Sequence, residues 1–118
     1  MPNQTHSIDA TFHALSDPTR RAVLSQLANG PATVTELAEP FEMALPSFLQ
    51  HLKVLEQSGL VRSEKQGRVR TCEFTPEPLE EIQGWIAEQK AIWEARLDRL
   101  EAYLETLKTS RAKDKTDE

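Results

Sequence analysis

The chain has 118 residues, of which 38% are hydrophobic and 28% are charged, and its formal net charge is −5. These values are typical of one globular domain, and they exclude a uniformly basic nucleic-acid-binding coat and a chain built from membrane spans. The N-terminal segment lacks the basic start and apolar block of a secretory signal, and the single Cys72 excludes an intramolecular disulfide. We therefore expect a cytoplasmic protein that does not enter a membrane, with a single domain over residues 1–108 and a polar, disordered tail over 109–118.

Two helices are expected at the start of the chain. Ile8, Phe12 and Leu15 recur at helical spacing and predict a short amphipathic helix. A second helix follows, since Asp17 is a good N-cap and the proline after it suits the first helical position. Gly30 is a suitable C-terminal stop for this second helix.

A pair of shorter helices is predicted next. Thr33 and Glu36 have the spacing of a capping box, which starts the third helix, and Pro40 ends it within a turn. The fourth helix starts near Leu45 and closes at Gly59. Its buried face is expected to consist of four apolar residues spaced three or four positions apart: Leu45, Phe48, Leu52 and Leu55.

Residues 60–74 predict a two-stranded antiparallel hairpin with Gly67 between the strands. In this prediction Val61, Ser63, Val69 and Thr71 share one face, and Arg62 and Arg70 lie on the other. Five basic side chains and only two acidic ones lie between Ala44 and Thr71, in a chain that is acidic as a whole. The positive charge is therefore concentrated on the fourth helix and the hairpin.

A long helix is expected from about Pro78 to Lys108. Its apolar residues recur at steps close to a heptad seam: Leu79, Ile82, Ile86, Trp93, Leu97, Leu100, Leu104 and Leu107. The expected fold class is thus mainly α with a small β-hairpin (α+β), arranged as a winged helix-turn-helix with a long C-terminal helix for dimerisation.

A helix pair followed by a basic hairpin is typical of DNA-binding proteins in which the second helix enters the major groove and the wing reaches the backbone. Gln50 can offer its amide to adenine, and Leu49 either touches a thymine methyl or packs under the wing. The predicted DNA-binding residues are Ser47, Leu49, Gln50, His51 and Lys53 on the helix, and Lys65, Arg68 and Arg70 on the wing. The partner expected from this pattern is double-stranded DNA.

Several side chains have two interpretations. His51 either contacts a phosphate or packs at the helix surface. Arg20 or Arg21 binds a phosphate or a carboxylate, or lies with its stem on apolar neighbours. Cys72 is either a redox switch or an inert strand thiol. Trp85 and Trp93 on the long helix either line an effector pocket or contact the core or a second subunit.

No catalytic or metal-binding constellation is expected. The histidines and the cysteine do not form a set of three or four ligands at plausible spacing, and neither a glycine-rich phosphate loop nor a nucleophile motif is present. The sequence therefore predicts no metal, no cofactor and no enzymatic activity.

Three parts of the chain resemble the ArsR-type bacterial transcriptional regulators: residues 12–38, residues 51–68 and the long helix. The motifs that carry the resemblance are "LSDPTRRAVL", "HLKVLEQSGLV" and the "GR" of the hairpin, and together they span roughly residues 8–108. The resemblance implies a winged-helix repressor that binds a partly palindromic operator as a homodimer, through its first and last helices. The dimer-interface residues expected on this basis are Ile8, Phe12, Leu15, Trp93, Leu97, Leu100 and Leu104.

This chain departs from the metal-sensing members of that family. Those members carry a cysteine pair in the third helix, where this chain has "TELAEPF", and its long helix contains no histidine. The sequence therefore resembles a metal-free branch, with a small-molecule effector as a further partner whose identity stays open. The alternative function is that of a winged-helix protein-interaction adaptor, whose acidic body would bind a basic protein.

Overall fold

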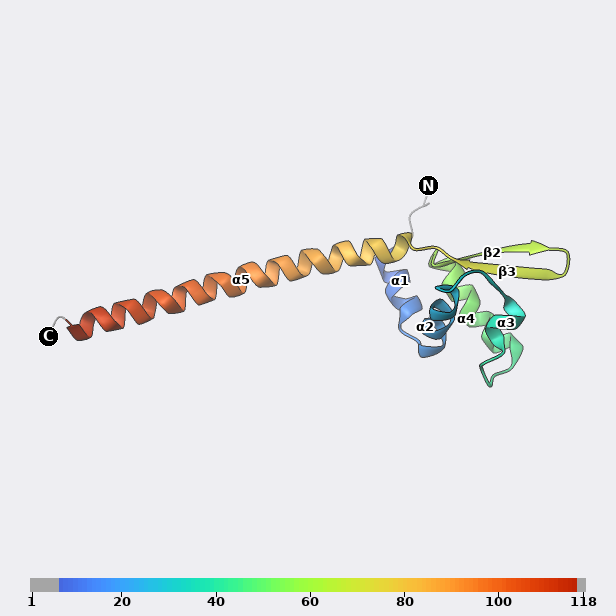
Figure 1. The fold of residues 1–118 in the computed structure, drawn as a ribbon, viewed down its shortest axis with the longest axis horizontal. Coiled ribbons are helices and arrows are strands. Elements are labelled where there is room, and N and C mark those ends of the chain that lie inside the picture. Colours follow the sequence, from blue (N-terminus) through green and yellow to red (C-terminus); the bar gives the residue numbers. More distant parts are fainter. Residues whose placement is uncertain (1–6, 117–118) are drawn as a thin grey trace. The chain divides into compact units, whose positions relative to one another are not determined.

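The computed structural model describes residues 7–116, which form five helices and three strands (Figure 1). The elements are α1 (Ile8–Leu15), α2 (Pro18–Leu27), β1 (Ala32–Thr33), α3 (Val34–Ala38), α4 (Leu45–Gln57), β2 (Val61–Gln66), β3 (Val69–Phe74) and α5 (Glu77–Thr116). This order confirms the predicted mainly α fold with a small antiparallel sheet and a long C-terminal helix. The chain divides after Ile82 into two compact units.

The predicted helix starts are confirmed by their caps. The Asp17 carboxylate accepts a hydrogen bond from the backbone N–H of Arg20 at 3.1 Å and so caps α2. Thr33 and Glu36 form the expected reciprocal capping box, with hydrogen bonds of 2.8 and 3.1 Å. Each of these caps depends on residues within one turn of one another, which is why the sequence predicts them.

The core of the first unit lies between α2, α4 and the sheet. Its buried residues are Ala14, Val23, Leu24, Leu27, Leu37, Phe48, Leu52, Leu55, Leu60, Val61 and Cys72. The prediction that Leu45 belongs to the buried face of α4 is wrong, because its side chain is 55% exposed. Leu45 occupies the first turn of α4, where it lines a surface groove and not the core.

The hairpin is confirmed, and the sheet gains a third strand that the sequence analysis did not predict. β1 pairs with β3 through Ala32 and Thr33 only, and two residues are too short to show a strand pattern. The strand order is β1-β3-β2. Figure 1 shows β2 and β3 side by side as a hairpin that projects beyond α3 and α4.

The predicted hairpin faces are wrong. The turn at Gly67 and Arg68 leaves two residues between the strands, and Gly67 adopts a φ of 65° that suits this tight turn. The register then places Val61 opposite Phe74, Ser63 opposite Cys72 and Lys65 opposite Arg70. Directly opposite residues share a face, so odd-numbered residues of β2 lie with even-numbered residues of β3. Arg70 consequently lies on the same face as Ser63, whereas Val69 and Thr71 lie on the face of Arg62.

The last helix begins within the first unit, where Leu79 packs against the core and Ile82 is buried. It runs to Thr116, so residues 109–116 are helical where the sequence analysis expects a disordered tail, and residues 117–118 lie outside the described residues. Beyond Ile82 the apolar side chains of α5 are exposed by 42% to 60%. Six of them recur at heptad-like spacing and form one stripe: Ile86, Trp93, Leu97, Leu100, Leu104 and Leu107. We name this stripe the α5 seam.

Neither α5 nor any other helix within residues 7–116 is long and apolar enough to cross a membrane.

Candidate nucleic-acid interface

The helix pair α3–α4 is held by apolar contacts along the connector between them. The rings of Phe41 and Phe48 lie 5.7 Å apart between their centroids, and Leu37 of α3 is fully buried. Because Phe48, Leu52 and Leu55 point into the core, the opposite side of α4 faces outward. Ser47, Leu49, Gln50 and Lys53, all predicted to bind DNA, are exposed there.

Two adjoining grooves cover this exposed side. The first has a volume of about 620 Å³ and is lined by Thr33–Thr35, by Leu45 and Leu49 of α4, and by the wing residues Lys65 and Arg68–Arg70. The groove therefore brings together α4, the start of α3 and the wing. We call α4 the recognition helix, because it is the second helix of the predicted pair.

The second groove lies along the other side of the same helix. Gln50 and Lys53 line it, and Leu49 and Arg70 line both grooves. The structure thus gathers every predicted DNA-binding residue around one pair of grooves, except Ser47, which is exposed nearby on α4, and His51. Leu49 and Val69 of the wing line the same groove, and the Leu49 side chain is 37% exposed there.

Three of the basic side chains at the grooves have no acidic partner. Lys53, Lys65 and Arg68 are exposed, and none of them forms an ion pair with any residue in the described part of the chain. A cation that is exposed and unpaired can approach a phosphate without first breaking a contact. These three side chains are therefore the positive charges that this surface can offer to DNA.

Arg70 is held by α4. Its Nη2 atom donates to both Glu56 carboxylate oxygens at 2.6 Å, and its Nε atom donates to Ser63 Oγ at 3.0 Å. Ser63 Oγ in turn donates to Glu56 Oε2 at 2.7 Å. We name this set of Glu56, Ser63 and Arg70 the wing clamp, because it joins both wing strands to the recognition helix. The clamp was missed at the sequence level because the hairpin faces were assigned wrongly, whereas the correct register places Ser63 and Arg70 together.

A second arginine of the wing is also paired. Arg62 forms a cross-strand ion pair with Glu73, directly opposite it on β3. The hydrogen bond to Glu73 and its negative charge raise the pKa of Arg62. Because this pair is exposed, it neutralises charge on the outer face of the wing but contributes little to stability.

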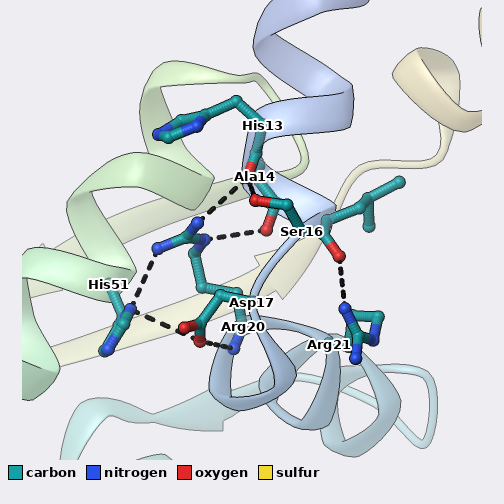
Figure 2. Close-up of polar contacts among 8 residues, drawn as sticks. His13, Ala14, Ser16, Asp17, Arg20, Arg21 and His51 are labelled. Carbon is teal, nitrogen blue, oxygen red and sulfur yellow. Dashed lines mark hydrogen bonds and ion pairs between the residues drawn. The ribbon is translucent and has the colours of Figure 1, made fainter.

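His51 lies on the side of α4 that faces α2, as Figure 2 shows. Its Nδ1 atom is 3.0 Å from Nη1 of Arg20 and 3.7 Å from Oδ2 of Asp17. His51 is half-buried in this contact and lines neither groove. The geometry supports the packing interpretation of His51 and not direct phosphate contact.

Arg20 and Arg21 bind the end of α1, which was neither of the two interpretations considered for them. Arg20 donates to the carbonyl oxygens of Ala14 at 2.8 Å and His13 at 2.9 Å, and Arg21 donates to that of Leu15 at 2.8 Å (Figure 2). The last carbonyls of a helix lack intrahelical partners and carry partial negative charge, so cationic donors stabilise them.

Cys72 is fully buried between β1 and β2. Burial raises the pKa of its thiol, and the nearby carboxylate of Glu56 acts in the same direction. A protonated, buried thiol is a poor nucleophile, so the structure supports the interpretation of Cys72 as an inert core residue. Residues 7–116 contain no group of three or more His, Cys, Asp or Glu side chains that could hold a metal ion.

These features define a winged helix-turn-helix protein: a recognition helix behind a short helix, flanked by a β-hairpin wing with unpaired cations. A helix-turn-helix domain family matches residues 15–64. The crystal structure of the ArsR family transcriptional regulator RHA00566 is 57% identical to this chain, with a TM-score of 0.72, over 74% of this chain and 90% of that one.

Two proteins that are similar to this chain in sequence are also transcriptional regulators. The HTH-type transcriptional regulator Rv2034 of Mycobacterium tuberculosis is 41% identical over 62% of this chain and 68% of its own length. The transcriptional repressor SdpR of Bacillus subtilis is 32% identical over 64% of this chain and 83% of its own length. The chain belongs to the ArsR family of transcriptional regulators and is a DNA-binding protein.

Proposed function

We propose that this regulator is a repressor that binds an inverted-repeat operator as a homodimer, acting in the cytoplasm by binding and not by catalysis. The observation that carries the proposal is the set of three unpaired cations, Lys53, Lys65 and Arg68, around the exposed side of α4. The likeness to SdpR, a transcriptional repressor, supports repression over activation.

In the proposed complex α4 lies in the major groove. Ser47 and Gln50 are exposed on its outer side, and the Gln50 amide has the donor and acceptor needed to read adenine. Lys53 is one turn further along and would contact the backbone. Lys65 and Arg68 on the wing would hold phosphates beside the groove or enter the adjacent minor groove.

We infer that the α5 seam is covered by the same seam of a second copy. The exposed leucines Leu97, Leu100 and Leu104 lie on one side of the helix, and a row of this kind on an isolated helix is typical of a helix that packs against another. On α1 the proposed interface residues are Ile8 and Leu15, which are half-buried, and Phe12, which is exposed. Two-fold symmetry would set the recognition helices about one DNA turn apart, giving half-sites roughly 10 base pairs apart.

The proposal is tested by selecting bound duplexes from a pool with a randomised central region. We expect an inverted repeat to be enriched, since two symmetric recognition helices read two copies of one half-site. The Gln50→Ala variant should relax the preference at one position of each half-site, because alanine cannot make the paired contact to a base. Glu88→Ala, on the side of α5 opposite the seam, is the control and should leave the selected sequence unchanged.

Two outcomes would contradict parts of the proposal. Enrichment of no sequence by the unmodified protein would favour the adaptor function over operator binding. An unchanged preference for the Gln50→Ala variant would remove Gln50 from base recognition while leaving operator binding intact.

A further inference from the structure

One buried guanidinium group joins three helices of the first unit. Arg20, at the start of α2, is only 8% exposed. Its Nε and Nη2 atoms bind the last carbonyls of α1, and its Nη1 atom contacts Nδ1 of His51 on α4. Each of its three nitrogens thus has a partner, and the partners come from the elements on either side of it. The recognition helix is linked to the end of α1 through this one side chain (Figure 2).

The protonation state of His51 follows from this contact. Arginine keeps all its N–H protons and has no acceptor, so Nη1 must be the donor in the 3.0 Å contact. Nδ1 of His51 must then present its lone pair, and the imidazole is neutral with its proton on Nε2. A protonated imidazole carries a proton on both nitrogens and cannot accept this hydrogen bond.

The carboxylate of Asp17 lies near the same nitrogen of His51. Asp17 Oδ2 lies 3.7 Å from Nδ1, beyond hydrogen-bond distance. Burial acts to raise the pKa of Asp17, but the hydrogen bond from the backbone N–H of Arg20 and the charge of Arg20 act in the opposite direction, and the pKa is lowered overall. Asp17 is therefore ionised at neutral pH and available to a protonated His51.

Within residues 7–116, the charged groups in contact with His51 are Asp17 and Arg20, both at the start of α2. From α1 the nearby groups are the main-chain carbonyls of His13 and Ala14, which Arg20 already binds. The imidazole of His13 itself is exposed. Protonation of His51 would thus exchange one partner for another: the hydrogen bond from Arg20 is lost and an ion pair with Asp17 takes its place.

We propose that His51 is a positioning residue for DNA binding, which holds the recognition helix against the α1–α2 corner by accepting a hydrogen bond from Arg20. Neutral His51 fixes α4 in the binding arrangement, and protonation releases α4 from Arg20. The inference rests on the proposed placement of α4 in the major groove. It assigns to His51 an effect on affinity without any contact to DNA.

Two variants of similar size separate this role from a phosphate contact. In His51→Asn the side-chain oxygen can occupy the position of Nδ1 and accept from Arg20, whereas His51→Leu fills the space without an acceptor. We expect the operator affinity of His51→Asn to stay within about threefold of the unmodified protein, and that of His51→Leu to fall about tenfold, the scale of one hydrogen bond to a charged group. The salt dependence of binding should be the same for all three proteins, because no phosphate contact is lost.

The pH dependence gives a second readout. On acidification from neutral pH the unmodified protein should lose at least about threefold in affinity relative to His51→Asn, since only the unmodified protein has an imidazole whose protonation removes the acceptor for Arg20. Thermal unfolding of each variant by circular dichroism establishes that the folded state is being compared.

The outcomes are distinguishable. Equal affinity and equal pH dependence for the unmodified protein and both variants would overturn the positioning role and leave DNA binding in place. A reduced salt slope for both variants would show instead that His51 contacts a phosphate. If the unmodified protein itself binds no duplex, the proposed function fails and not the role of His51 alone.

Discussion

Two neighbouring arginines of the wing should behave differently when DNA binding is measured against salt concentration. Arg68 is exposed at the tip of the hairpin without an ion pair among the described residues, and Arg70 is bound to Glu56 in the wing clamp. We predict that Arg68→Ala reduces the salt dependence of binding and that Arg70→Ala does not. The two variants remove the same charge two residues apart, so each is the control for the other.

The magnitude follows from the number of unpaired cations. Each chain offers Lys53, Lys65 and Arg68, so the proposed dimer would neutralise about six phosphates, and the slope of log K against log salt would be about −5 at about 0.9 per phosphate. Arg68→Ala removes two of these contacts per dimer, which should flatten the slope by about 1.8. Between about 50 mM and about 200 mM salt the unmodified protein should therefore lose about three decades of affinity, and the variant about two.

Arg70→Ala should lower affinity by another route. It leaves the carboxylate of Glu56 without its cationic partner and frees both wing strands from α4, so the loss should be similar at every salt concentration. Fluorescence anisotropy with a labelled operator duplex, at four or more salt concentrations, measures both slopes. A slope for Arg68→Ala equal to that of the unmodified protein, or an equal flattening by Arg70→Ala, would refute the distinction between free and clamped arginines.

Two further predictions concern the α5 seam and the buried thiol. Leu100→Asp should separate the proposed dimer, because it would bury a charge in an apolar contact, whereas Ala102→Asp, on the opposite side of the helix, should leave the dimer intact; sedimentation velocity distinguishes these results, and an intact dimer for Leu100→Asp would place the interface elsewhere. Cys72 should react with a thiol reagent much more slowly in the folded protein than in denaturant at the same pH, because burial raises its pKa and blocks access; equal rates in a spectrophotometric thiol assay would contradict the buried position.

The sequence predicted those parts of the fold that depend on neighbouring residues. The caps at Asp17 and Thr33 involve partners three residues away, and the exposed side of α4 follows from the spacing of its buried residues. The placement of Gln50 and Lys53 on that exposed side was predicted for the same reason. Local signals of this kind need no knowledge of the tertiary structure.

The sequence did not predict contacts that depend on pairing between distant segments. Arg70 was assigned to the face of Arg62 because residue parity alone does not reveal the hairpin register. Leu45 was assigned to the core because its spacing fits, although the first turn of α4 projects to the groove. The contact between Arg20 and His51 joins residues 31 positions apart and left no local pattern in the sequence.

The charge that this protein can offer to DNA is set by pairing and not by composition. Of the five basic residues between Ala44 and Thr71, Arg62 and Arg70 are already paired with Glu73 and Glu56. Each of these pairs cancels a positive charge, yet the wing clamp also fixes the strands that carry Lys65 and the turn that carries Arg68. An acidic chain can bind a polyanion under this arrangement, because its few free cations are held around a single pair of grooves by carboxylates that are themselves neutralised.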